Sequence, residues 1–244
     1  MKNTPDVTDH RFQAQLKVLR TKIDTFIRLH GPNVAAEREC FEQVLDIFAR
    51  KAPWEMVVLS TDIRKSTRMM GEAIDFIVFG ELLTEYVSTS AELIRDNGGF
   101  FDKFTGDGYI AYWMTTPSCT FDKMFDEIVP FIVASKKYFR EDLMPKIRRN
   151  SFNVPDGAGL SFGLDCGPVY FTNVGKDISI LGKPVVGAVR MVQAASPYEV
   201  VINRGYGDRL IAAGLIKNGL ELKLASRKTK EYPEGQEMYL LDGI

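Results

Sequence analysis

Apolar residues recur with two different periods along the chain, and the alternation of these periods predicts its elements. Helical spacing runs from residue 10 to about 49, where the breaker His30–Asn33 divides it into two helices. We interpret this part either as an appendage that packs on the main domain or as a helical pair that supports a dimer. Further helices are predicted over 67–96, 119–149, 184–195 and 204–214. Pro130 and Pro145 are expected to end or kink the second of these.

Runs of aromatic and β-branched residues between Gly, Pro and polar clusters predict the strands. They cover 55–62, 100–104, 108–114, 200–202, 219–225 and 236–242. The stretch 159–171 is predicted as two strands around a turn at Cys166–Pro168. Hairpins set among helices favour an α+β fold with a mostly antiparallel sheet over a doubly wound parallel one. The chain therefore divides into an N-terminal helical segment, 1–52, and a main domain, 53–244.

Composition excludes several classes of function. A net charge of −1 over 244 residues gives no footprint for nucleic acid, and no apolar run approaches the length for membrane insertion. The only histidines, His10 and His30, exclude a histidine zinc site or a Ser-His triad. Three cysteines without metal-ligand spacing (Cys40, Cys119 and Cys166) are typical of reduced thiols in a cytoplasmic protein.

Two aspartates stand where predicted strands end. Asp107 lies in the Asp-Gly turn of the hairpin formed by 100–104 and 108–114, between two glycines that permit a close approach. Asp62 closes the apolar run 56–61. A pair of carboxylates at strand ends is a way to hold divalent metal against a triphosphate. The pattern predicts two Mg²⁺ or Mn²⁺ ions per site.

Three stretches together resemble the class III nucleotidyl cyclases. Leu59–Thr67 is similar to the family's sDIxgfT strand end, and Gly98–Gly108 to its GGxxxKxxGDG hairpin. Gly163–Arg190 is similar to its GIhxG…yxxxGxxVNxAaR segment. The resemblance implies a ferredoxin-like α+β domain that acts as a homodimer, with each active site shared between two protomers.

Residue roles follow from the same resemblance. Asp62 and Asp107 match the metal-binding aspartates, and Ile63 would lend its backbone carbonyl to the metal. Arg190 matches the arginine that stabilises charge on the transferring phosphate, a task suited to a guanidinium. The basic loop Arg227–Lys230 would supply a phosphate-binding lysine or would be only a solvated turn.

The nucleotide would contact two further groups of residues. Backbone N–H groups of Lys65, Ser66 and Thr67, at the start of the predicted long helix, would bind phosphate. Lys103 matches the lysine that contacts the base from the partner protomer, and Ser179 falls on the second base-reading position. Lysine donates, whereas serine both donates and accepts, so the pair suits uracil but also a purine through other contacts.

The chain departs from the family at Val186, where an asparagine that orients the ribose is usual. The chain resembles the uridylate cyclases of bacterial Pycsar anti-phage defence in three respects. These are the loss of this asparagine, the variant sequence of its hairpin and its compact organisation. Such cyclases convert UTP to 3′,5′-cyclic UMP and diphosphate, and the product activates a separate effector. The alternatives are an adenylate or guanylate cyclase, and a degenerate cyclase-like module that binds nucleotide without turnover. Retention of Asp62, Asp107 and Arg190 argues against the last.

Overall fold

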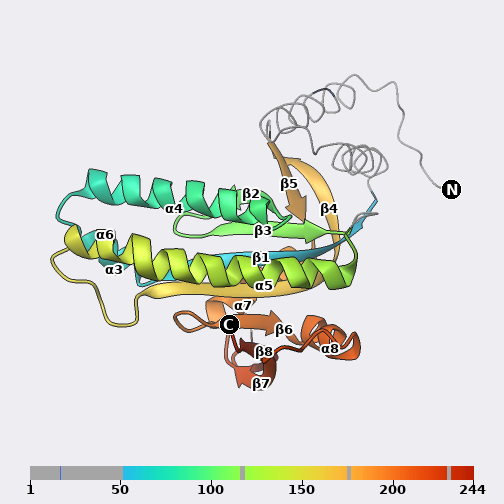
Figure 1. Cartoon of the computed structure of the whole chain (residues 1–244). Helices are drawn as coiled ribbons and strands as arrows, with labels where there is room; N and C mark the ends of the chain where they lie inside the picture. Colours follow the sequence, from blue (N-terminus) through green and yellow to red (C-terminus); the bar gives the residue numbers. More distant parts are fainter. Residues whose placement is uncertain (1–16, 18–51, 116–118, 175–176, 230–231) are drawn as a thin grey trace.

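The computed structural model describes Lys17 and residues 52–115, 119–174, 177–229 and 232–244 (Figure 1). The two predicted N-terminal helices, Lys17 apart, lie outside the described residues.

An eight-stranded sheet forms the centre of the domain. Seven strands follow the order β2-β3-β1-β4-β6-β8-β7, and β5 pairs with β4 beside this path. Among the strands that the structure describes, β4 and β6 alone pair in parallel, and the other pairings are antiparallel; the sequence predicted a mostly antiparallel sheet. The strands are β1 (Trp54–Arg64), β2 (Phe100–Phe104), β3 (Tyr109–Met114), β4 (Gly159–Val174), β5 (Asp177–Leu181), β6 (Val200–Asn203), β7 (Glu221–Arg227) and β8 (Gln236–Asp242).

Helices cover both faces of this sheet. The described ones are α3 (Ser66–Gly71), α4 (Phe76–Asp96), α5 (Phe121–Tyr138), α6 (Met144–Arg149), α7 (Lys183–Ala194) and α8 (Arg204–Ala212), with a π-helical turn, η2 (Phe139–Leu143), between α5 and α6. Phe162 and Leu164 of β4 belong to the main core cluster, to which α4 and α5 also contribute. Gly163 between them faces α7 instead, because an added Cβ would lie 2.3 Å from the Ala188 carbonyl oxygen. Figure 1 shows α4 and α5 side by side on one face.

The prediction of one long helix over 67–96 is wrong. Two helices, α3 and α4, fill this range, and residues 72–75 separate them. Asp75 has an extended backbone, and its carboxylate accepts from the N–H groups of Ile77 at 2.8 Å and Val78 at 3.3 Å. This cap starts a new helix. An isolated bridge between Ala73 and Ser151 fixes the interruption.

The prediction of two strands around Cys166–Pro168 is also wrong. β4 is continuous, because β1 pairs with it from Trp54↔Val169 to Arg64↔Gly159 and holds the backbone extended throughout. The reversal comes after Val174, where β5 returns along the end of β4. Figure 1 shows this β4–β5 arm extending away from the rest of the sheet. α5 likewise continues through Pro130, so no helix ends there.

The β2–β3 hairpin is anchored to the core behind it by Trp113. Its ring packs directly over Gly99, where an added Cβ would lie 2.6 Å from the indole. The Trp113 Nε1–H group donates to the carbonyl of Asn97 at 2.7 Å. These contacts require glycine at the start of the hairpin and fix the direction in which its tip points.

Candidate functional site

The tip of the β2–β3 hairpin docks on the end of β1. An added Cβ on Gly108 would lie 2.0 Å from the Thr61 carbonyl oxygen, so only glycine permits this approach. The backbone N–H of Tyr109 donates to Thr61 Oγ1 at 3.0 Å. Two segments far apart in sequence are thereby held together, and the neighbours Asp62 and Asp107 come close enough to interact electrostatically.

The environment of the two carboxylates is suited to a cation. Burial raises the pKa of Asp62; Arg64, with Nη1 3.0 Å from Oδ2, opposes this shift, and the charge of Asp107 adds to it. The hydroxyl of Ser66 donates to Asp107 Oδ2. Because repulsion between two carboxylates contributes to the shift, a bound divalent cation would relieve it.

The residues present fit the predicted metal site. Pairing of β1 with β3 ends at Ser60↔Ile110, so beyond Ser60 this edge of β1, which leads to Ile63, has no strand beside it among the described residues. In the described part of the chain no three acidic, histidine or cysteine side chains gather around a possible metal position. Asp62, Asp107 and the Ile63 carbonyl would therefore share the ions with triphosphate oxygens and water, as Mg²⁺ sites in phosphoryl-transfer enzymes do.

The predicted phosphate-binding residues lie directly after this strand end. Lys65 has a left-handed backbone (φ 66°), and α3 begins at Ser66. The helix that follows them is thus the six-residue α3 and not the long α4. The role of Lys65, Ser66 and Thr67 stays a prediction, and the Ser66 hydroxyl is already directed to Asp107.

The two predicted base-reading residues contact each other. Lys103 Nζ donates to Ser179 Oγ at 2.8 Å, which joins β2 to the β4–β5 arm. A third residue, Asp102, completes the group: it accepts from the Ser179 hydroxyl at 3.1 Å and from the Ile180 N–H at 3.0 Å. Its side chain is 1% exposed, whereas that of Lys103, 3.3 Å away, is 45% exposed.

Asp102 is a residue that sequence reasoning missed. The pairing of β2 with β3 shifts register between Phe101 and Lys103, so Asp102 is the extra residue of a β-bulge. Bulges redirect side chains, and this one turns Asp102 toward β5. A bulge has no local sequence signature, and the partner of Asp102 lies 77 residues further along the chain.

Arg190 lies on α7, with its guanidinium carbon 5.7 Å from the centre of the Tyr232 ring. Tyr232 belongs to the β7–β8 loop and was also missed. In the basic loop, Arg227 donates to Glu199 at 2.5 and 2.9 Å and to the Ala194 carbonyl at 2.7 Å, so its role is structural. Lys228 is exposed, and Lys230 lies outside the described residues.

Solved structures with the same arrangement of elements are nucleotide cyclases. The adenylyl cyclase CyaB from P. aeruginosa matches 79% of this chain and 95% of its own, with a TM-score of 0.65 and 21% identity. The guanylyl cyclase Cya2 matches the same 79% and 93% of its own, with a TM-score of 0.62 and 18% identity. The chain has the class III nucleotidyl cyclase fold.

A third cyclase structure extends this comparison to a nucleotide complex. The guanylate cyclase domain of RhGC from Catenaria anguillulae, solved with GTP, matches 79% of this chain and 98% of its own, with a TM-score of 0.62 and 16% identity. A scan of protein-family models and a search of curated proteins find no match to the sequence. None of the helices described in this cyclase fold is long and apolar enough to cross a membrane.

Proposed function

We propose that this protein is a nucleotidyl cyclase that converts UTP to 3′,5′-cyclic UMP and diphosphate. The observation that carries the proposal is the proximity of Asp62 and Asp107 where the hairpin tip docks on the end of β1. Strand β2 of the same hairpin carries Lys103, which donates a hydrogen bond to Ser179. In a dimer with shared sites, the metal site of one protomer and the base-reading pair of its partner together provide what a nucleoside triphosphate needs along its length.

The residues divide the work of cyclisation. When bound, two Mg²⁺ or Mn²⁺ ions activate the ribose 3′-hydroxyl and neutralise the triphosphate. Asp62, Asp107 and the Ile63 carbonyl hold these ions. Ser66 orients the carboxylate of Asp107 through its hydroxyl. The 3′-oxygen attacks the α-phosphorus as the hydroxyl proton passes to solvent, and the bond to diphosphate breaks.

Two further parts of the chain act on the phosphates. The backbone N–H groups of Lys65, Ser66 and Thr67 bind phosphate oxygens beside the strand end. Arg190 stabilises the charge that develops on the transferring phosphate, because a guanidinium offers a fork of donors to it. Its contribution comes from the partner protomer, as the resemblance implies.

The hydrogen-bond directions in the base-reading group are compatible with uracil. The single proton of the Ser179 hydroxyl is committed to Asp102, so this oxygen is left to accept, whereas the Lys103 ammonium retains a donor. Uracil offers a carbonyl oxygen to Lys103 and its imide N–H to Ser179. A purine can present one acceptor and one donor as well, so substrate assays must decide.

A homodimer would complete each site. The β4–β5 arm, which carries Ser179, exposes the apolar side chains of Tyr170 and Leu181. Helix α7, which carries Arg190, exposes Val186. Apolar side chains grouped in this way are typical of an interface. An active monomer would contradict the shared site.

The role that goes with this activity is anti-phage defence in the cytoplasm, where cyclic UMP would activate a separate effector. It rests on the resemblance to Pycsar cyclases. The second candidate is a purine cyclase, favoured by the fact that the structures matched above are adenylyl and guanylyl cyclases. The third is a nucleotide-binding module without turnover, suggested by valine at position 186.

The test is incubation of the purified protein with ATP, GTP, CTP and UTP and Mn²⁺, with products separated by chromatography and identified by mass. Cyclic UMP as main product supports the proposal, and a cyclic purine nucleotide supports the second candidate. Asp62→Ala and Asp107→Ala should abolish turnover, whereas Asp96→Ala, in an exposed acid of α4, should leave it unchanged. Turnover that survives in either of the first two would refute the metal assignment.

A further inference from the structure

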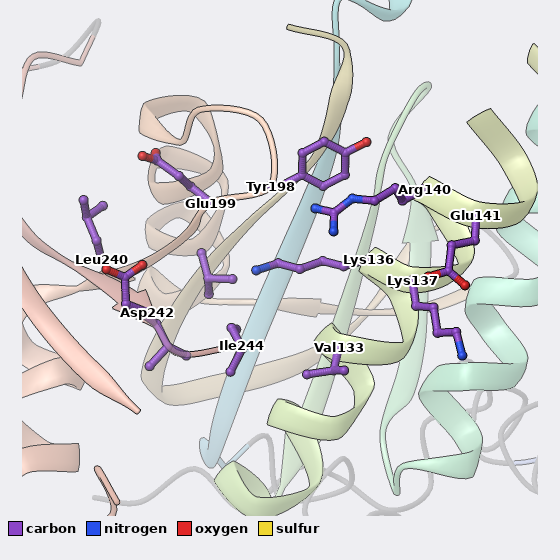
Figure 2. Close-up of a pocket in the computed structure, with 12 residues that line it drawn as sticks. Val133, Lys136, Lys137, Arg140, Glu141, Tyr198, Glu199, Leu240, Asp242 and Ile244 are labelled. Carbon is purple, nitrogen blue, oxygen red and sulfur yellow. The ribbon is translucent and has the colours of Figure 1, made fainter. Parts of the chain in front are cut away.

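A hollow lies on the opposite face of the sheet from α7. Its cavity of about 450 Å³ is in the range of small-molecule sites. The end of α5 and the turn η2 form one wall, and the loop before β6 and the end of β8 form the other (Figure 2). Apolar side chains, among them Val133 and Ile244, lie beside charged ones in its lining.

Two cations of one helical row face this space. Lys136 and Arg140 are four residues apart, so they lie on the same side of α5 and η2. Figure 2 shows both side chains reaching toward the opposite wall, whereas Lys137 and Glu141 point away from it. The helix therefore presents two positive charges to the hollow.

The acids of the opposite wall are already paired. Glu199 accepts from Arg227 at 2.5 and 2.9 Å and from the Ser196 N–H at 2.7 Å. Asp242 Oδ2 lies 2.5 Å from Lys223 Nζ. The side-chain amine of Lys136 makes no hydrogen bond or ion pair with any residue that the structure describes. Burial, together with the nearby charge of Arg140 and against the opposing charge of Asp242, lowers its pKa to about 8.

Arg140 is held in place by an unusual tyrosine. Its guanidinium carbon lies 4.5 Å from the centre of the Tyr198 ring. Tyr198 has a left-handed backbone (φ 64°), which is rare for an aromatic residue, and its N–H donates to the Leu160 carbonyl at 2.8 Å. Its ring packs on Gly159, where a Cβ would lie 2.7 Å from it. Strain of this kind is found where the surroundings fix a side chain for a task.

We propose that this hollow binds a small organic phosphate, a phosphate monoester held by Lys136 and Arg140 with its organic part against Val133 and Ile244. Two cations match the two charges of a phosphate monoester dianion, and the fixed guanidinium supplies the fork that phosphate oxygens accept from. The site lies across the sheet from α7 and Arg190, so phosphate binding there does not depend on the proposed cyclase activity.

Calorimetric titration of the full chain with phenyl phosphate and with inorganic phosphate, in the presence of a metal chelator, tests this. We expect one saturable site that binds phenyl phosphate more tightly than inorganic phosphate. Lys136→Met should weaken binding by at least about tenfold, the loss of one hydrogen bond to a charged group. Lys136→Arg should retain most of the affinity. Lys137→Met is the matched control and should change it by less than about twofold.

Proton uptake gives a second readout that a merely structural role would not move. The groups around Lys136 are Arg140, Lys137 and Glu141 on its own helix, Tyr198 and Glu199 from the loop before β6, and Asp242 from β8. Because a bound anion favours the charged amine, binding at pH 8.5 should take up protons in the wild type and not in Lys136→Met.

Three results would overturn the site. They are the absence of saturable binding to the wild type, an equal loss of affinity in Lys137→Met, and proton uptake unchanged by Lys136→Met. An Arg190→Gln variant should leave the titration unaltered, which separates this hollow from phosphate binding at the candidate cyclase site.

Discussion

Asp102→Ala should loosen the β4–β5 arm and impair nucleotide recognition together. The substitution removes the acceptor of the Ile180 N–H at 3.0 Å and of the Ser179 hydroxyl at 3.1 Å. A buried donor left without a partner costs about 1–3 kcal/mol, and a hydrogen bond to a charged group contributes about 1.5–3 kcal/mol. Because the arm can relax, we expect a loss of roughly 2–4 kcal/mol of unfolding free energy.

This loss is large enough to measure by thermal unfolding. A domain of this size loses about 2–4 °C in Tm per kcal/mol, so Asp102→Ala should lower Tm by about 4–16 °C. Asp102→Asn retains an acceptor for the Ile180 N–H and loses mainly the charge next to Lys103. Because Lys103 is half-exposed, that loss should cost no more than about 1 kcal/mol.

The activity of Asp102→Asn carries the sharper information. Its amide would donate to Ser179 where the carboxylate accepts, so the Ser179 oxygen would no longer be reserved for the base. We expect KM for the nucleotide to rise while the metal dependence stays as in the wild type. Asp96→Ala, which removes a carboxylate that is 61% exposed, is the stability control. If Asp102→Ala were as stable as this control, the three-residue network would not hold the arm.

Gly108→Ala should reduce both Tm and turnover, because its Cβ would lie 2.0 Å from the Thr61 carbonyl and displace the hairpin tip. Gly71→Ala, whose added Cβ meets nothing within 4 Å, should be neutral in the same assays. Burial raises the pKa of Asp165 to about 7, above its unfolded value, so the native state binds the extra proton and stability should fall as pH rises from about 4 to 7. Asp165→Asn should remove this slope, and its gain in Tm over the wild type should be larger at pH 8 than at pH 5. An equal gain at both pH values would show that burial of the charge is not the cause.

Local signals in the sequence predicted much of this molecule. An Asp-Gly pair between apolar runs predicted the hairpin, and the run before Asp62 predicted β1, because both depend on neighbouring residues only. The break between α3 and α4 was hidden since Ile74 and Ile77 keep helical spacing although they are exposed. Helical spacing of these apolar residues predicted the buried face of a single helix. The cap formed by Asp75 instead starts a second helix at this point.

The rest of the candidate site depends on contacts between distant segments. Gly167–Pro168 has the composition of a turn, yet pairing with β1 keeps it within β4. The role of Asp102 follows from a shift in the register of β2 against β3 and from its contact with β5. Neither is encoded within a window of neighbouring residues, so the sequence singles out Lys103 and Ser179 but not Asp102, which joins them.

Because β4 is continuous, the β4–β5 arm is supported by the sheet at one end only. The first part of β4 pairs with β1 and β6 in the middle of the sheet. The last part of β4 pairs with β5, which carries Ser179. Because side chains alternate along a strand, lengthening β5 by one residue would turn this hydroxyl to the other face, whereas two residues would restore it. The length of the arm can therefore change only by an even number of residues if Ser179 is to stay on the same face. Substrate choice can diversify in such steps while the strand ends that carry Asp62 and Asp107 stay untouched.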